Sequence, residues 1–422
     1  MILNCDIRLP ASKSESNRAL MIASYGGFAP HFQNLSDSND TIVLAKALRE
    51  IQQNKAILDI ADCGTAARFL TTFLACSEGE WILTGTERMK QRPIGPLVET
   101  LKWLGADIQY VGKEGCLPLQ INGRAIVGGQ AAVDMSQSSQ FASSLLLAAP
   151  MWPEGLDLEL EGGLNSLPYL DMTLNIMRHF SAQVERKGNR VIVLPKPYCS
   201  ADFTVSPDWT AASYWYEMAA LSNECEIKLL GFAAHLSLDK SNALSSNAFE
   251  PVENLSPMFS LQGDALVADW MRQLGVETQS AGNAIVLRKM SFGKKSFSFD
   301  FSHHPDLFPT MAATCAGLQV EARFTGISTL KLKESDRVKA MQLELAKIGT
   351  QLVYLADNEL VLKPALALPY YEKSAPLLFS SHNDHRVVMA LAPLALKVGA
   401  VGFDFPQVVE KSYPRFWHDT QF

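Results

Sequence analysis

The pattern of hydrophobic and polar positions predicts a structural repeat. Four segments each read as an amphipathic helix that ends at a small residue and is followed by a strand. They are ETLKWLGADIQYV, LNIMRHFSAQVER, VADWMRQLGVETQ and ELAKIGTQLVYL, aligned on Leu104, Phe180, Leu274 and Ile348. Self-similarity at a nearly fixed interval is typical of a repeated supersecondary unit. The longer interval before the third copy contains residues 237–257, whose Ser, Asn and Pro content predicts a surface loop.

A second set of six helices is predicted between the members of the first. These segments are rich in Ala and other small apolar residues on all sides, which suits close burial, and each opens with polar residues. They are SKSESNRALMIASYG, CGTAARFLTTFLA, SSQFASSLLLAAP, PDWTAASYWYEMAAL, HPDLFPTMAATCAG and NDHRVVMALAPLAL. Short strands such as WILTG and RVIVLP lie between them. Six βα units in two groups of three predict an α/β chain with two similar domains, although ordinary α/β composition also gives such patterns.

Composition and charge narrow the class of protein. A chain of 422 residues suits two large domains, and 47% hydrophobic with 19% charged residues is typical of a soluble enzyme. The net charge of -7 argues against a large surface for nucleic acid. No signal peptide or membrane span is recognisable, and the seven scattered cysteines form no C-x-x-C pair. We therefore expect free thiols and a cytoplasmic protein.

The opening of the first small-residue helix suggests anion binding. A helix N-terminus presents unpaired N–H groups and a positive dipole end, so it attracts anions. Ser12 and Glu15 have the spacing of a capping box, and Lys13, Ser14 and Arg18 add two cations and a hydroxyl. Taken alone, this opening also suits an ordinary capped helix with a solvated Lys and Arg.

Further polar residues stand at the other openings. Gly64 lets the backbone approach a ligand closely, and Arg92, before a proline, is held in an extended geometry that can present its guanidinium to an anion. The remaining candidates are Ser138, Ser139, Gln140, Ser166, Tyr169, Asp306, Lys333, Glu334, Arg337, His385, Arg386 and Lys411. Each group, taken alone, also fits a turn or a surface ion pair. We expect no metal site at His382 and His385, because no complementary ligand spacing accompanies them.

Together these motifs resemble the 3-phosphoshikimate 1-carboxyvinyltransferase (5-enolpyruvylshikimate-3-phosphate synthase) family from end to end. The matching stretches are LPASKSESNRAL, CGTAARFL, LTGTERMKQRPIGPLVETL, SSQFASSLLLAAP, SLPYLDMTL, LKESDRVKAM, NDHRVVMAL and the Lys411 region. The resemblance implies an α/β enolpyruvyl transferase fold of two similar domains, each of three βαβαββ units, with the active site in the interdomain cleft. Residues 12–206 would bind mainly shikimate 3-phosphate. Residues 1–11 and 207–422 would complete the phosphoenolpyruvate site and supply acid–base residues.

The resemblance also implies a reaction. The enolpyruvyl group of phosphoenolpyruvate would pass to the 5-hydroxyl of 3-phosphoshikimate by addition–elimination, which releases phosphate in a step of chorismate and aromatic amino-acid biosynthesis. Neither metal nor cofactor is implied, and glyphosate would compete for the phosphoenolpyruvate site. The expected partners are the two small-molecule substrates, with no nucleic acid and no membrane, and the expected state is a monomer.

Residue roles follow from the resemblance position by position. Residues implied to bind 3-phosphoshikimate are Lys13, Ser14, Arg18, Ser138, Ser139, Gln140, Ser166, Tyr169, Asp306 and Lys333. Residues implied to bind phosphoenolpyruvate are Lys13, Gly64, Arg92, Gln140, Arg337, Arg386 and Lys411. Catalytic roles fall to Asp306 as the base at the 5-hydroxyl, to Glu334 and His385 in proton transfer, and to Lys13, which reaches both substrates.

Two departures and two rival functions bear on this prediction. Asp62 and Thr329 stand where the family often has Asn, and a carboxylate at Asp62 would repel a nearby phosphate unless it is protonated or turned away. The related UDP-N-acetylglucosamine enolpyruvyl transferase opens with Lys-Asn and has a reactive loop cysteine, so the Lys13-Ser14 pair and the 88–93 loop fit it badly. A non-catalytic anion-binding protein would not need Asp306 and Glu334 beside the full cationic set.

Overall fold

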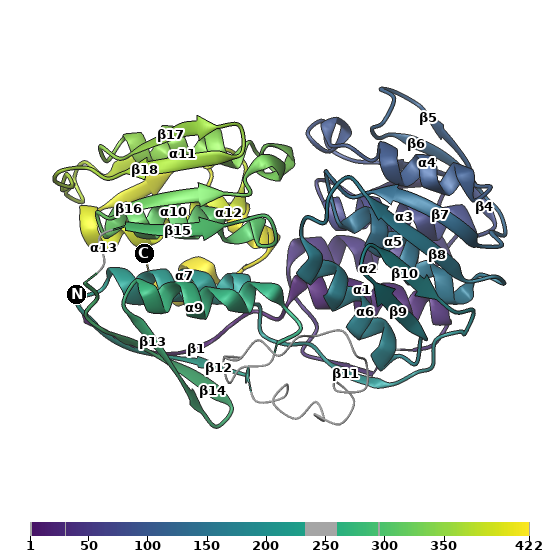
Figure 1. The fold of residues 1–422 in the computed structure, drawn as a ribbon, viewed down its shortest axis with the longest axis horizontal. Coiled ribbons are helices and arrows are strands. Elements are labelled where there is room, and N and C mark those ends of the chain that lie inside the picture. The colour runs from purple at the N-terminus through teal and green to yellow at the C-terminus, as the bar shows by residue number, and fades with distance from the viewer. Residues whose placement is uncertain (1, 30, 233–259, 294–295, 422) are drawn as a thin grey trace. The chain divides into compact units, whose positions relative to one another are not determined.

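The computed structural model describes residues 2–29, 31–232, 260–293 and 296–421 (Figure 1). The loop predicted at 237–257 lies outside these described residues. Internal contacts divide the chain into two units, which we describe separately. Unit 1 comprises Met1–Ser12, Ser206–Lys331 and Ser335–Phe422, and unit 2 comprises Lys13–Val205 with Leu332–Glu334.

Unit 2 contains two four-stranded sheets and one parallel strand pair. Its helices are α1 (Lys13–Gly26), α2 (Asn39–Gln52), α3 (Gly64–Cys76), α4 (Gly95–Trp103), α5 (Gln140–Ala148) and α6 (Leu167–His179). Its strands are β2 (His31–Gln33), β3 (Ile57–Asp59), β4 (Gly79–Thr84), β5 (Asp107–Tyr110), β6 (Leu119–Gly123), β7 (Gly129–Asp134), β8 (Leu156–Glu161), β9 (Val184–Lys187), β10 (Arg190–Val193) and β11 (Asp202–Thr204). The sheet orders are β3-β4-β6-β5, β7-β8-β10-β9 and β11-β2.

Unit 1 repeats this composition. Its helices are α7 (Trp209–Leu221), α9 (Val267–Gln273), α10 (Phe308–Gly317), α11 (Arg337–Ala346), α12 (His385–Leu391), α13 (Ala395–Val398) and α14 (Phe416–Thr420). Its strands are β1 (Ile2–Arg8), β12 (Glu224–Leu230), β13 (Val276–Ala281), β14 (Ala284–Lys289), β15 (Ser296–Asp300), β16 (Glu321–Thr325), β17 (Gln351–Ala356), β18 (Glu359–Lys363), β19 (Leu377–Phe379) and β20 (Val401–Phe403). The sheet orders are β1-β12-β14-β13, β15-β16-β18-β17 and β19-β20.

The four-stranded sheets explain the repeat in the sequence. Each has two parallel strands followed by two antiparallel ones, as in the series β3, β4, β6 and β5. The amphipathic helices α4, α6, α9 and α11 each precede the outer strand of one sheet, namely β5, β9, β13 and β17. The predicted fourfold repeat is therefore confirmed. Unit 1 and unit 2 each contain one further, reduced repeat, which has only a parallel strand pair among the described residues: β19-β20 in unit 1 and β11-β2 in unit 2. This explains why six small-residue helices accompany four full repeats.

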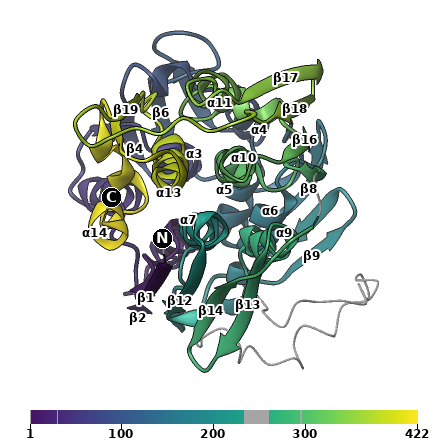
Figure 2. The same cartoon turned by 90° about the vertical axis from the view of Figure 1, so that its left-hand side faces the viewer.

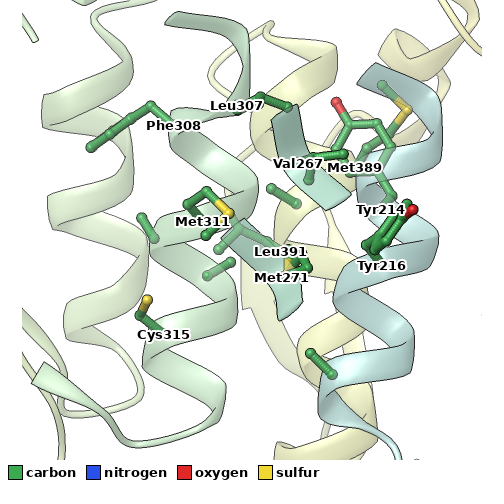
Figure 3. Packing of buried hydrophobic residues seen from close by; sticks show 14 of the residues in the cluster. Tyr214, Tyr216, Val267, Met271, Leu307, Phe308, Met311, Cys315, Met389 and Leu391 are labelled. Atoms are coloured by element: carbon green, nitrogen blue, oxygen red, sulfur yellow. The ribbon is translucent and has the colours of Figure 1, made fainter. Parts of the chain in front are cut away.

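The small-residue helices pack against one another inside each unit. In unit 2, α1, α3 and α5 are in mutual contact. In unit 1, α10 packs on α7 (Figure 2) and on α12, whose Met389 and Leu391 lie near Met311 of α10 (Figure 3). Every residue of α7 and of α10 is buried, as their composition predicted. A Cβ atom on Gly317 of α10 would stand 2.6 Å from Leu221 Cδ2 of α7, so a glycine permits this close approach.

The polar openings of four of these helices lie where the sequence predicted them. The first helical residues of α1, α3, α5 and α12 are Lys13, Gly64, Gln140 and His385. The amphipathic helix α11 begins at Arg337, so Lys333 and Glu334 precede it. Asp336 and Asp384 cap α11 and α12 by accepting hydrogen bonds from the backbone N–H groups of Lys339 and Arg386. Candidate ligand-binding groups therefore stand at helix N-termini, where anions are favoured.

Candidate active site

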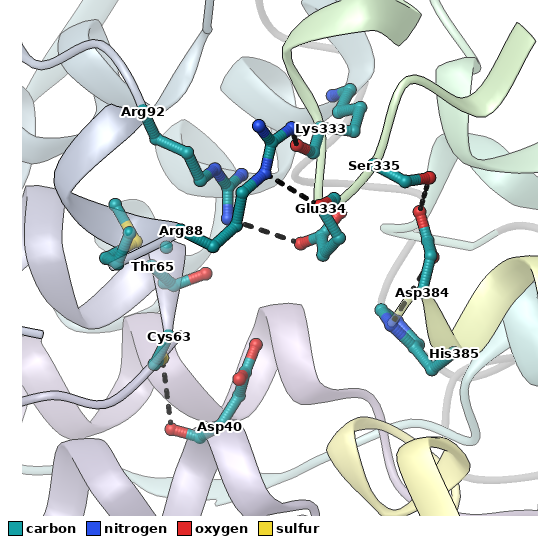
Figure 4. Close-up of polar contacts among 12 residues, drawn as sticks. Asp40, Cys63, Thr65, Arg88, Arg92, Lys333, Glu334, Ser335, Asp384 and His385 are labelled. Carbon is teal, nitrogen blue, oxygen red and sulfur yellow. Dashed lines mark hydrogen bonds and ion pairs between the residues drawn. The ribbon is translucent and has the colours of Figure 1, made fainter. Parts of the chain in front are cut away.

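Three helix N-termini of unit 2 are linked through Asp40 of α2. Its carboxylate oxygen Oδ2 lies 3.1 Å from Lys13 Nζ at the start of α1, with both side chains largely buried. Its carbonyl accepts a hydrogen bond from the Sγ atom of Cys63, the N-cap of α3, at 3.5 Å (Figure 4). The positive dipole ends of α1, α2 and α3 therefore lie close to one ammonium group, an arrangement that attracts anions.

Arg18 is buried in unit 2 and bonded mainly to uncharged groups. Its guanidinium donates to Thr173 Oγ1 at 2.7 Å, to the Ser14 carbonyl at 2.9 Å and to the Tyr169 carbonyl at 3.2 Å. Burial lowers the pKa of Arg18 to about 10, so the side chain still carries its charge at neutral pH. Neutral acceptors orient this cation without cancelling its charge, which leaves it able to bind an anion.

Arg68 is a candidate that the motif analysis did not single out. It is 2% exposed, and it donates to the Gly64 carbonyl at 3.2 Å and to the Pro93 carbonyl at 2.6 Å. Burial, with a smaller effect from Arg92, lowers its pKa to about 9. It thus joins the start of α3 to the Arg92 loop. The available signal was a charged residue inside a helix otherwise built of small buried residues.

Gly64 and Arg92 are near neighbours in unit 2. A Cβ atom on Gly64 would stand 2.7 Å from Arg92 Nη1, so only glycine leaves this guanidinium in its place without a shift. Arg92 has φ -81° and ψ 137°, which confirms the extended geometry predicted from the following proline. Its Nη1 lies 3.4 Å from Glu334 Oε1.

Lys333 and Glu334 belong to the short segment that groups with unit 2 by its contacts. Arg88 Nε donates to the Glu334 carbonyl at 3.0 Å, and Arg88 Nη2 donates to the Lys333 carbonyl at 3.1 Å (Figure 4). The 88–93 loop, which carries the predicted phosphoenolpyruvate ligand Arg92, therefore also bonds to the backbone of these two candidates.

The candidates at α5 and α6 stand at helix starts as well. Gln140 Nε2 donates to Thr65 Oγ1 at 3.2 Å, and the Gln140 N–H donates to Ser138 Oγ at 3.2 Å. Ser139 and Ser166 are 6% and 7% exposed. Ser166 has φ 58°, a left-handed conformation that is uncommon for a residue other than glycine and that recurs at functional sites.

In unit 1 the candidates converge on two carboxylates. Arg337 Nη1 donates to Asp306 Oδ1 at 2.8 Å, and Arg386 Nη2 donates to Asp306 Oδ2 at 2.7 Å. Arg337 Nε donates to Asp384 Oδ2 at 2.9 Å. Ser335 Oγ donates to the same oxygen at 3.0 Å (Figure 4). Each oxygen of Asp306 thus accepts from a different guanidinium, which fixes the direction in which this carboxylate points.

The remaining sequence candidates are placed as follows. His385 is 1% exposed, with Nδ1 3.7 Å from Asp384 Oδ1. Lys411 and Thr329 are buried in unit 1 at 5% and 6% exposure, and Asp62 is exposed in unit 2, in the turn before α3. Among the described parts of the chain, no helix is both long and apolar enough to cross a bilayer.

Solved structures share the fold of this chain. The chain matches an EPSP synthase from Acinetobacter baumannii with a TM-score of 0.70 at 19% identity, covering 99% of this chain and 95% of that one. It matches the enolpyruvyl transferase NikO from Streptomyces tendae with a TM-score of 0.71 at 14% identity, covering 99% and 94%. The enolpyruvyl transferase fold predicted from the sequence is confirmed. At these identities, the two matches bear on the fold alone.

Sequence comparison gives the family. The family model for EPSP synthase (3-phosphoshikimate 1-carboxyvinyltransferase) matches residues 32–239 and 251–420. A 3-phosphoshikimate 1-carboxyvinyltransferase from Bacteroides fragilis is 40% identical, covering 99% of this chain and 95% of that protein. One from Photobacterium profundum is 30% identical, covering 98% and 95%. The chain belongs to the EPSP synthase family, which confirms the resemblance found in its sequence.

Proposed function

We propose that the chain transfers the enolpyruvyl group of phosphoenolpyruvate to the 5-hydroxyl of 3-phosphoshikimate. Relatives named for this reaction cover nearly the whole chain at 30% and 40% identity. The observation that carries the mechanism is Asp306, a carboxylate held at both oxygens by Arg337 and Arg386. A positioned base beside cations suits an attack by a hydroxyl on an anionic substrate.

Unit 2 supplies the binding of the shikimate phosphate in this proposal. Lys13 and Arg18 provide two cations, and the starts of α1, α5 and α6 add hydroxyl, amide and backbone donors. The contributing side chains are Ser14, Ser138, Ser139, Gln140, Ser166 and Tyr169. Charge-assisted hydrogen bonds of this kind are about twice as strong as neutral ones, so a doubly charged phosphate is well matched.

Phosphoenolpyruvate would be held by the second set of cations. These are Lys13, Arg92, Arg337, Arg386 and Lys411. Gly64, which has no side chain, would let the ligand approach the backbone, and the side-chain amide of Gln140 would donate a hydrogen bond. As phosphate leaves the adduct, the same guanidinium groups would stabilise the developing charge. Arg68 would keep Gly64 and Arg92 in register through its bonds to the Gly64 and Pro93 carbonyls.

The acid–base steps divide among separate groups. Asp306 takes the proton of the 5-hydroxyl while the hydroxyl oxygen bonds to C2 of phosphoenolpyruvate, and C3 gains a proton from Glu334; His385 and Lys13 are further candidates for proton transfer. In the second step Glu334 takes a proton back from C3 while the bond from C2 to the phosphate oxygen breaks and phosphate leaves. Carboxylates in different surroundings can take such opposite roles. We place this reaction in the cytoplasm and expect a monomer.

A phosphate-release assay tests the proposal. Phosphoenolpyruvate is supplied with 3-phosphoshikimate, with UDP-N-acetylglucosamine, or with no acceptor. We expect release with 3-phosphoshikimate alone. Release with the nucleotide sugar would assign the other acceptor, and no release with any of the three mixtures would favour a non-catalytic anion-binding protein.

A further inference from the structure

The turn between β19 and α12 has an unusual backbone. His382 and Asn383, two consecutive residues other than glycine, have φ 49° and φ 52°. Left-handed geometry brings Cβ close to the following carbonyl, and asparagine and histidine tolerate this better than most side chains. Two such residues in succession are nevertheless held in place by their surroundings.

Two carboxylates supply that support. Glu344 of α11 is 2% exposed, and its Oε2 accepts from the Ser380 N–H at 2.9 Å while its Oε1 accepts from His382 Nε2 at 2.8 Å. Asp404, which follows β20, accepts from the Ser381 N–H at 2.7 Å and from Ser380 Oγ at 2.8 Å. Glu344 is the one of the two that bonds to the His382 side chain itself.

The turn leads directly into the candidate active-site residues of unit 1. Asp384 follows it, accepts the Arg386 N–H at 3.0 Å as the cap of α12, and accepts from Arg337 Nε at 2.9 Å. Arg386 in turn donates to Asp306. A change in the turn would therefore move the cap and the guanidinium together.

We propose that Glu344 is a positioning residue for the phosphoenolpyruvate site. It acts through Ser380 and His382, holding the turn in its left-handed form so that Arg386 keeps its direction. Neither Glu344 nor His382 is required to touch a substrate. The inference rests on the proposed role of Arg386 in binding phosphoenolpyruvate.

Steady-state kinetics of two variants test it. Glu344→Met keeps the length of the side chain and removes both acceptors, and His382→Asn keeps a residue that tolerates left-handed geometry but lacks the imidazole. We expect Glu344→Met to raise the KM for phosphoenolpyruvate by about ten- to a hundredfold, because small misplacements of binding groups have effects of this size. The KM for 3-phosphoshikimate should change much less. His382→Asn should shift the KM for phosphoenolpyruvate in the same direction by a smaller factor.

Two further variants separate the possible outcomes. Glu359→Met removes a carboxylate that pairs with Arg323 in the sheet of the same unit, and it should leave both KM values unchanged. Arg386→Lys tests the underlying role, and a normal KM for phosphoenolpyruvate in that variant would refute the role itself. A raised KM in Arg386→Lys with normal values in His382→Asn and folded Glu344→Met would refute the positioning role alone. If Glu344→Met does not fold, the His382→Asn result decides.

Discussion

The cations of the two units are balanced in different ways. In unit 2, Arg18 and Arg68 donate mainly to carbonyl and hydroxyl oxygens. In unit 1, Arg337 and Arg386 donate to the carboxylates of Asp306 and Asp384. Lys13 and Arg92 of unit 2 also have carboxylate partners, Asp40 and Glu334, so the difference lies in Arg18 and Arg68. Neutral acceptors orient these two arginines and leave their charge for a phosphate group, whereas Arg337 and Arg386 share their charge with the carboxylate that they hold in a fixed direction.

The largest effect is expected at Lys13. Lys13→Met removes a cation that serves both substrates in our proposal, and we expect turnover to be abolished while the thermal unfolding curve stays close to wild type. Lys46→Met, an exposed change on α2, is the matched control because it also removes a lysine from an ion pair. Near-normal activity in folded Lys13→Met would mean that the charge of unit 2 is not what binds the substrates.

The next largest effect is expected at the two proposed acid–base carboxylates, Asp306 of unit 1 and Glu334. Asp306→Ala should lower kcat by roughly two to four decades with little change in KM, the range typical of a lost acid–base group. Glu334→Ala should do the same by removing the proton donor. If either substitution raises only KM, that residue binds substrate and the proposed division of acid and base is wrong.

A smaller effect is expected where Gly64 meets Arg92. We expect glyphosate to compete with phosphoenolpyruvate and to bind more tightly when 3-phosphoshikimate is present. Gly64→Ala places a methyl group against Arg92 Nη1, so it should weaken inhibition and raise the KM for phosphoenolpyruvate by about tenfold. Glyphosate titrations of wild type, Gly64→Ala and Asp62→Asn show whether the space at Gly64 or the charge at Asp62 sets the sensitivity. An insensitive wild type that becomes sensitive as Asp62→Asn would make the charge at Asp62 decisive.

The smallest effect concerns a carboxylate of unit 1 that has no cationic partner among the residues that the structure describes. Glu217 of α7 is fully buried, and neither oxygen has a hydrogen-bond partner among the described residues. Burial raises its pKa well above the ordinary value of 4.5. Glu217 therefore ionises at a lower pH in the unfolded chain than in the folded protein. Its contribution to the free energy of unfolding is fully present below pH 4.5 and is lost as pH rises toward the pKa of Glu217 in the folded protein.

Glu217→Met should remove the free-energy cost of burying this carboxyl group without a hydrogen-bond partner. We expect the variant to be more stable than wild type at pH 8 by about 1–3 kcal/mol, the usual cost of an unsatisfied buried polar group. The gain should be smaller at pH 5, where less of the acid ionises on unfolding. Thermal melts at both values measure it, with Glu217→Gln to separate charge from polarity. A gain that does not depend on pH would show that packing, and not ionisation, is responsible.

Local sequence signals predicted most of the fold. Residues such as Leu104 and Phe180 mark repeated helix ends because periodicity is a short-range property of the chain. The helix α2 was not predicted. It belongs to the reduced repeat of unit 2, and no copy of it recurs at the repeat interval. The two-stranded sheets were likewise not foreseen, because three-residue strands such as β2 leave no alternating pattern.

The sequence predicted which residue types stand at the candidate site, but not which hydrogen-bond partners they have. Lys13, Gly64 and His385 could be assigned to helix starts from adjacent polar residues. The bonds of Lys13 to Asp40 and of Arg18 to Thr173 join residues 27 and 155 positions apart. No pattern in one sequence reports such distances. Arg68 could have been found from its charge inside a helix of small buried residues, but its acceptor at Pro93, 25 positions away, is not visible in the sequence.

The pairing of β1 with β12 has a consequence for biosynthesis. The two strands run in parallel from Ile2 and Glu224 to Arg8 and Leu230, so the partner of β1 is made 222 residues later. At ordinary ribosomal speeds of about 5–20 residues per second, the first strand waits roughly 10–45 seconds for its neighbour. An unpaired strand is open to wrong partners during that time. Asn4, Asp6 and Arg8 alternate along β1 with apolar residues, and polar side chains at such positions disfavour pairing with a wrong strand before the sheet closes.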